Sequence, residues 1–289
     1  MSVEVTAAPA PAASSAISTS TPARHIPSLD GIRAGSFLLV FAAHAGLGHL
    51  LPTELDLIQG DFGVTIFFFL SGFLITTLLR SELEKHGSVN IRHFWLRRAL
   101  RILPPLFVVV SAAALATLML YPAGTLRGSA IAADLLFYGN YWGLFSFHQG
   151  EPPGIGVVWS LAVEEHFYLL FPLLYIAMQK WRMAPRSQAL LLWGLCAVVL
   201  VWRCMLVLGM HAPTARIYVA TDTRVDSILF GCALAVWNNP VLDKPTQPSK
   251  LWKYVLLPLS LAILLACLVY RNAVFLNTWC FSLQGAALT

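Results

Sequence analysis

Residues 62–79 read FGVTIFFFLSGFLITTLL and contain no charged side chain. A run of this length matches the roughly 20 apolar residues that an α-helix needs to cross a bilayer. Comparable apolar runs recur along the chain at 34–51, 102–120, 157–178, 189–208 and 254–270. A shorter run covers 225–238, a weaker one covers 130–147, and another begins at Ala273. The sequence therefore predicts an all-α, polytopic transmembrane helix bundle of about eight to nine spans.

The composition agrees with this fold class. Hydrophobic residues make up 57% of the 289 residues and charged residues only 11%, whereas soluble domains carry about 25% charged residues. The net charge of +5 is typical of basic cytoplasmic loops. The sequence contains no basic patch with interleaved aromatic residues, which is the pattern that would indicate nucleic-acid binding. The five cysteines form no C-x-x-C pair and no metal-type spacing with histidine, so we expect neither a metal site nor a tightly bound cofactor.

The chain divides into a tail and one membrane domain. Residues 1–23 are rich in Ala, Pro, Ser and Thr, which predicts a disordered cytoplasmic tail; residues 24–289 form the integral-membrane domain. The loop between the second and third runs is strongly basic and should be cytoplasmic, with the N-terminus inside. If 130–147 is re-entrant, the basic residues at 180–186 are also cytoplasmic; if it spans, they lie outside. The sequence leaves both topologies open.

Two ionisable residues occupy the first apolar run. Charges at this depth cost about 2.5–3.5 kcal/mol and usually mark function. Arg33 and His44 are eleven residues apart, which places them on one helix stripe about 16 Å apart along the axis. Asp30 can pair with Arg33 on the same face. If Arg33 lies at the cytoplasmic boundary, His44 lies near the middle of the bilayer, where a neutral imidazole can act as a base. The alternative is a histidine that only packs between helices.

Residues 159–168, WSLAVEEHFY, place two adjacent carboxylates in an apolar helix. Glu164 and Glu165 point about 100° apart. Ser160, Glu164 and Tyr168 share one stripe, so we expect Glu164 to face a polar cavity and Glu165 to lie nearer the rim. The alternative is an interfacial charge pair.

Three arginines begin the third long run, in RRALRILP at 97–104. Arg97, Arg98 and Arg101 suit bidentate phosphate contacts, although an ordinary positive-inside anchor explains them equally well. Near the short run at 225–238, Arg224 and Asp226 are predicted to form a structural ion pair.

Five segments together resemble the membrane acyltransferase-3 family, which includes bacterial O-acetylases of lipopolysaccharide and peptidoglycan and some macrolide acyltransferases. The segments, in family order, are SLDGIRAGSFLLVFAAH (28–44), FFFLSGFLIT (67–76), RRALRILP (97–104), WSLAVEEHFYLLFP (159–172) and TRVDSILFGCALA (223–235).

The resemblance implies an inner-membrane, multi-pass enzyme that transfers an acyl group, usually acetyl from acetyl-CoA, to a hydroxyl of a carbohydrate, glycolipid or macrolide. It assigns His44 and Arg33 to an essential pair, Glu164 to the active centre, and Arg98 and Arg101 to the donor. In the implied mechanism His44 accepts the hydroxyl proton and Glu164 steadies the imidazolium; an acyl-histidine intermediate stays open. Supporting roles fall to Asp30, Trp159, Ser160, Tyr168, Arg224 and Asp226.

Two other readings remain. Intramembrane His, Glu and Arg also suit a transporter or flippase. Members of the family commonly have about ten spans, so the resemblance implies that C-terminal helices are missing here. A truncated, non-catalytic relative is therefore the third reading. The acceptor, the acyl chain length and the oligomeric state are left open by the sequence.

Overall fold

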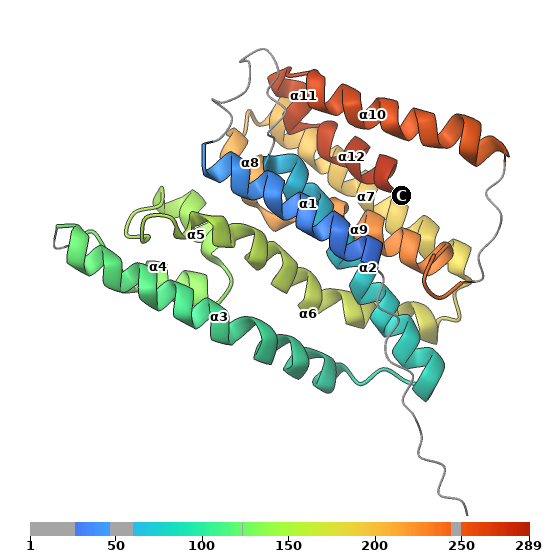
Figure 1. Ribbon diagram of the computed structural model, residues 1–289, viewed down its shortest axis with the longest axis horizontal. Coiled ribbons are helices and arrows are strands. Elements are labelled where there is room, and N and C mark those ends of the chain that lie inside the picture. The colour runs from blue at the N-terminus through green and yellow to red at the C-terminus, as the bar shows by residue number, and fades with distance from the viewer. Residues whose placement is uncertain (1–26, 47–59, 123, 244–249) are drawn as a thin grey trace, which may run out of the picture.

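The computed structural model describes residues 27–46, 60–122, 124–243 and 250–289. The regular elements of these ranges are all helical (Figure 1). The predicted tail and the end of the first expected span lie outside them. The α-helices are α1 (Pro27–His44), α2 (Gly60–His86), α3 (Ile91–Leu120), α4 (Gly128–Leu135), α5 (Gly139–Ser146), α6 (Trp159–Lys180), α7 (Pro185–Cys204), α8 (Thr214–Val219), α9 (Thr221–Trp237), α10 (Leu257–Val269), α11 (Ala273–Asn277) and α12 (Cys280–Leu288).

Five helical segments of the described chain are long and apolar enough to cross a membrane. They confirm the runs predicted around 62–79, 102–120, 157–178, 189–208 and 254–270. Short 3₁₀ or π turns extend three of them. The segments are Gly60–His86, Ile91–Leu120, Ile155–Lys180, Pro185–Gly209 and Trp252–Val269. The expected total of eight to nine spans is not confirmed: α1 and α9 are shorter helices, and the stretch after Ala273 divides into α11 and α12.

The ambiguous stretch 130–147 does not form one spanning helix. It divides into α4 and α5, each of eight residues and so about 12 Å long, against about 30 Å of bilayer hydrocarbon. Phe137, between them, adopts a left-handed conformation with φ of 60°. The consecutive long helices α3 and α6 therefore run in opposite directions, and the start of α3 lies at the same end of the bundle as the end of α6 (Figure 1).

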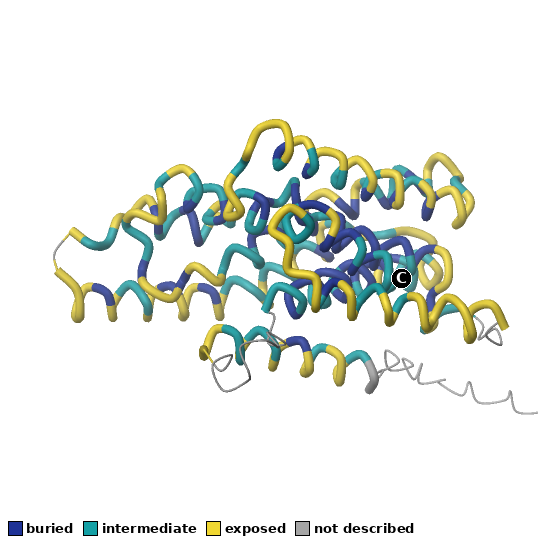
Figure 2. Tube along the Cα trace, turned by 90° about the horizontal axis from the view of Figure 1, so that it is seen from above, coloured by how far each residue is buried: buried dark blue, intermediate teal, exposed yellow. Residues whose placement is uncertain are grey.

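The centre of the bundle is a close crossing of α2 and α9. A Cβ added to Gly72 would lie 1.9 Å from the carbonyl oxygen of Ile228, and one added to Gly231 would lie 1.9 Å from that of Phe69. Small residues at facing positions let two membrane helices approach to backbone contact. Helix α9 is almost entirely buried at this crossing, whereas the peripheral helices expose much of their surface (Figure 2).

Helix α1 packs against α2 in the opposite direction. A Cβ on Gly63 would approach the Ser36 carbonyl oxygen to 2.8 Å, and one on Gly60 would lie 2.9 Å from Cβ of Ala43. The C-terminal end of α1 is thus level with the start of α2. This pairing sets how far along the bundle each polar residue of α1 lies.

The outward faces carry the apolar side chains expected of a multi-pass membrane protein. Large hydrophobic residues stay exposed on α3, α7 and α10, among them Val108, Leu118, Val198 and Leu261. Only 17% of the most apolar part of α3 and 6% of that of the α10 segment are buried within the protein. Such surfaces are stable when lipid covers them.

Candidate active site

Glu164 lies on α6, where two neighbouring hydroxyl groups donate hydrogen bonds to it. The Ser71 hydroxyl of α2 donates to Oε2 over 2.9 Å, and the Tyr168 hydroxyl, one turn further along α6, donates to the same oxygen. The predicted stripe of Glu164 and Tyr168 is therefore real. Ser160, one turn before Glu164, makes a different contact: its hydroxyl donates to the Val157 carbonyl over 3.3 Å.

Two arginines from other helices act on this carboxylate. The guanidinium carbon of Arg98, on α3, lies 3.7 Å from the centre of the Tyr168 ring, and both Arg98 and Arg33 of α1 interact electrostatically with Glu164. We call Arg33, Ser71, Arg98, Glu164 and Tyr168 the Glu164 centre. These residues come from four helices. The sequence analysis had singled out residues of three of these helices, α1, α3 and α6, for separate reasons.

The structure does not bring His44 to the Glu164 centre. His44 is the exposed last residue of α1, and its Nδ1 lies 2.8 Å from the carbonyl oxygen of Val40. Arg33, which interacts electrostatically with Glu164, lies about 16 Å back along the same axis. The expected contact between Glu164 and a His44 imidazolium is therefore absent from the described residues. His44 lies at the end of the α1–α2 pair and Arg33 further in. Asp30 is exposed.

The two other arginines that were predicted to bind the donor are exposed. Arg97 is exposed and forms an ion pair of 3.2 Å with Glu82 near the end of α2. Arg101 is exposed on α3. Arg101 is one turn from Arg98 but stays exposed, and of the three arginines only Arg98 stacks on Tyr168 in the described part of the chain.

A cavity of about 270 Å³ lies between α3 and α6, closed at one end by the α4–α5 turn. The lining residues form one stripe on each helix: Trp95, Arg98, Ala99, Ile102 and Leu103 on α3, Glu165, His166, Tyr168 and Leu169 on α6, and Leu136 and Phe137 on the turn. We call this cavity the α3–α6 slot.

The slot corrects the prediction made for the two carboxylates. Glu165, not Glu164, lines this cavity, and Oε1 of Glu165 is buried without a hydrogen-bond partner in the described part of the chain. Helical spacing predicts the angle between the two side chains. It does not predict which of the two side chains lines a cavity. Arg98 and Tyr168 form the wall between the slot and Glu164.

His166 is a polar residue of the slot that the sequence reasoning passed over. Its Nδ1 lies 2.7 Å from the Thr221 hydroxyl at the start of α9, and Asn140 of α5 donates to that hydroxyl over 3.2 Å. A histidine inside an apolar helix, next to two glutamates, was the available signal. Its partners tie α5, α6 and α9 together, which is a structural role.

Trp159 and Arg224 belong to a second cluster, in which Arg224 is fully buried and Trp159 is partly buried. The Trp159 ring packs on Phe68 and Tyr218. The Arg224 side chain donates to the Thr65 hydroxyl over 3.3 Å, and its guanidinium carbon lies 3.6 Å from the centre of the Phe281 ring.

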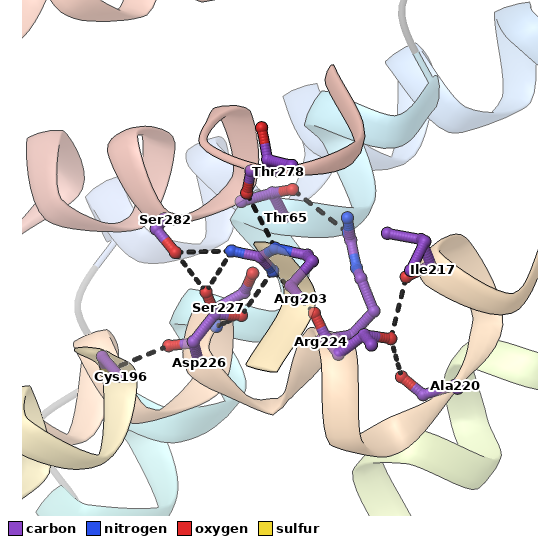
Figure 3. A network of polar contacts seen from close by, with 11 residues as sticks. Thr65, Cys196, Arg203, Ile217, Ala220, Arg224, Asp226, Ser227, Thr278 and Ser282 are labelled. Carbon is purple, nitrogen blue, oxygen red and sulfur yellow. Dashed lines mark hydrogen bonds and ion pairs between the residues drawn. The ribbon is translucent and has the colours of Figure 1, made fainter. Parts of the chain in front are cut away.

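The expected ion pair of Arg224 with Asp226 is wrong. Asp226 pairs instead with Arg203 of α7 over 2.9 Å, and both side chains are fully buried. Figure 3 shows Arg203 and Asp226 meeting at Ser282, while Arg224 points to Thr65. Residues two apart on a helix do not face each other, so the partner of Asp226 had to come from another helix.

Asp134, at the end of α4 and outside the spanning helices, gives a pH-dependence prediction. Burial, and after it the charge of Glu151, raise the pKa of its carboxyl from 3.8 to about 7, while His148 opposes the shift. Because folding favours the protonated acid, this stabilisation is complete below pH 3.8 and is lost as the pH rises through about 7. We expect Asp134→Asn to have a higher Tm than the wild type at alkaline pH and an equal one at acidic pH, measured by tryptophan fluorescence in nanodiscs.

The matched control is Glu84→Gln, which alters an exposed carboxyl and should leave the pH profile of Tm unchanged. Parallel profiles for Asp134→Asn and the wild type would contradict the shifted pKa of Asp134.

The site is a carboxylate inside a multi-pass helical bundle, held by hydroxyl groups and arginines. The class is therefore a membrane protein with a buried polar centre. A family described as the acyltransferase domain, acyltransferase-3, matches residues 26–289. The chain belongs to this family, as the five sequence segments indicated.

Named relatives share this region. Peptidoglycan O-acetyltransferase OatA of Listeria monocytogenes is 35% identical over 238 residues, covering 78% of this chain and 36% of the relative. Putative peptidoglycan O-acetyltransferase YrhL of Bacillus subtilis is 33% identical over 268 residues, covering 86% and 39%. A putative O-acetyltransferase of Staphylococcus aureus is 31% identical over 239 residues, covering 81% and 38%. The chain thus spans under two fifths of the length of these relatives. No solved structure matches it.

Proposed function

We propose that this protein is an integral-membrane O-acyltransferase that moves an acetyl group from acetyl-CoA to a carbohydrate hydroxyl. The Glu164 centre carries the proposal, because a carboxylate that interacts with arginines of two other helices leaves a cationic site suited to donor phosphates. The names of the relatives support O-acetyl transfer and make peptidoglycan glycan strands the first acceptor to test. Family membership favours this function over a transporter.

The proposed topology follows from charge. An N-terminus in the cytoplasm and an inner-membrane location put the basic loop between α2 and α3 inside. The opposite directions of α3 and α6 then bring Lys180, Arg182 and Arg186 to the same side, which agrees with the positive-inside rule.

His44 is the proposed base, and the contact with Val40 supports it. A carbonyl oxygen only accepts hydrogen bonds, so the 2.8 Å contact means that Nδ1 carries the proton and that Nε2 has a free lone pair in the neutral ring. Nε2 takes the proton of the acceptor hydroxyl as its oxygen attacks the thioester carbonyl carbon. The carbon–sulfur bond breaks, and the leaving thiolate takes the proton from the imidazolium, giving the ester and free CoA. Val40, rather than Glu164, fixes the tautomer.

The distance between Arg33 and His44 suits the donor. Eleven residues of helix span about 16 Å. The arm of CoA from phosphate to thioester carbon has about 14 bonds, which at the projected length of about 1.2 Å per bond in an extended chain span about 17 Å. A donor with its phosphates at Arg33 and Arg98 can therefore present its thioester to His44, which accounts for the separation of His44 from the Glu164 centre.

The test uses two donors of different length. We expect the protein in nanodiscs to transfer labelled acetyl from acetyl-CoA to soluble peptidoglycan glycan fragments. Arg33→Ala should raise the KM for acetyl-CoA about tenfold or more, and should leave the KM for S-acetyl-N-acetylcysteamine, which has no phosphate, nearly unchanged. The control is Arg186→Ala, an exposed cation at the start of α7, which should affect neither.

Two outcomes would contradict separate parts of the proposal. If neither donor supports transfer to the glycan fragments, the acyltransferase assignment fails, and a non-catalytic relative is the better reading. If Arg33→Ala raises both KM values equally, Arg33 does not bind donor phosphate.

A further inference from the structure

Tyr168 is held by a different partner at each end. Its side chain is 2% exposed. The hydroxyl donates to Glu164, Arg98 covers the ring at 3.7 Å, and the backbone carbonyl accepts from Nε1 of Trp95 over 3.1 Å. One residue of α6 thus contacts a carboxylate on its own helix and two side chains of α3.

The two side-chain contacts act on two charged groups of the Glu164 centre. Tyr168 and Ser71 both donate to Oε2 of Glu164, so they orient the carboxylate and leave Oε1 for another partner. The ring face attracts the Arg98 guanidinium and sets its plane. Since α3 is otherwise mostly exposed, this stack is one of the few contacts that locate Arg98 relative to α6.

We propose that Tyr168 is a positioning residue, which holds the Glu164 carboxylate through its hydroxyl and the Arg98 guanidinium through its ring. The inference rests on the proposed function, in which Arg98 binds donor phosphate. Both ends of the side chain therefore serve donor binding: the hydroxyl orients the carboxylate between Arg33 and Arg98, and the ring sets the plane of the Arg98 guanidinium.

Two substitutions separate these contributions. Tyr168→Phe keeps the ring under Arg98 and removes the hydrogen bond to a charged group, so the KM for acetyl-CoA should rise about tenfold while kcat stays within about twofold. Tyr168→Leu also removes the aromatic face, so the KM for acetyl-CoA should rise about fivefold or more in addition. With S-acetyl-N-acetylcysteamine that KM increase should disappear, because the donor has no phosphate for Arg98 to bind.

Tyr175→Phe is the matched control. Tyr175 lies two turns further along α6, is equally buried at 2% exposure, and interacts with Arg80 and Gln179, outside the Glu164 centre. Removing its hydroxyl is the same chemical change and should leave both kinetic constants near the wild-type values.

The kinetic constants of these variants test the proposal for Tyr168. Wild-type kinetics for Tyr168→Phe, or an equal rise of KM in the Phe and Leu variants, would overturn the division of roles. Should Tyr168→Leu not fold, the Phe variant and its control still test the hydroxyl. A wild-type protein that transfers acetyl from neither donor overturns the proposed function and the inference with it, a result distinct from active protein with unaltered Tyr168 variants.

Discussion

Replacing Arg203 with methionine is expected to destabilise the protein by about 3–5 kcal/mol, because it leaves the Asp226 carboxylate buried without its counter-charge. Arg203 reaches Asp226, the Thr223 and Thr278 carbonyl oxygens and the Ser282 hydroxyl at 2.5–3.3 Å. These contacts join α7, α9 and the segment that contains α11 and α12. Thermal unfolding in nanodiscs, followed by tryptophan fluorescence, measures the loss as a lower Tm.

The double variant Arg203→Met/Asp226→Leu separates charge from packing. Replacing both members of a buried ion pair with apolar residues is often near neutral, so the double variant should regain much of the Tm. Arg186→Met, at an exposed position, controls for loss of an arginine. A double variant no more stable than Arg203→Met would show that lost packing, and not the unpaired charge, destabilises the single variant.

The long helices could be predicted because twenty apolar residues in a row have few other stable arrangements. Where the predicted spans failed, the sequence held a local conflict. The stretch 130–147 carries Asp134, Asn140 and glycines, and it breaks at Phe137 into two short helices. Helix α9 is short, and its burial depends on the glycine crossing with α2, a contact between distant segments that no local pattern contains.

The polar residues show the same division between local and distant information. Four-residue spacing correctly joined Glu164 to Tyr168. The partners Ser71 and Arg98 come from other helices, and no spacing rule relates them to Glu164. Arg203 was passed over although it lies inside the predicted run 189–208. The rule that intramembrane charges need partners applied to it equally.

Changing His44 to alanine is expected to lower kcat for acetyl transfer by about 10²–10⁴-fold, the usual contribution of general-base catalysis. The effect follows from the Nδ1 contact with Val40, which leaves Nε2 to accept the proton. Because His44 is exposed at the end of α1, added imidazole should reach the vacated position and restore part of the rate. Acetyl transfer to glycan fragments, with and without imidazole, measures both effects.

His93→Ala is the control, because His93 is exposed near the start of α3 and away from the proposed base; it should keep normal kinetics and show no response to imidazole. Full activity of folded His44→Ala would remove His44 as the base. The proton would then have to go to a carboxylate, and Glu165 of the α3–α6 slot, with its unpartnered buried oxygen, would be the group to test next. A lowered rate that imidazole restores would instead locate the proton transfer at His44, at the outer end of α1. That position is about 16 Å from Arg33, close to the length of the CoA arm between phosphate and thioester.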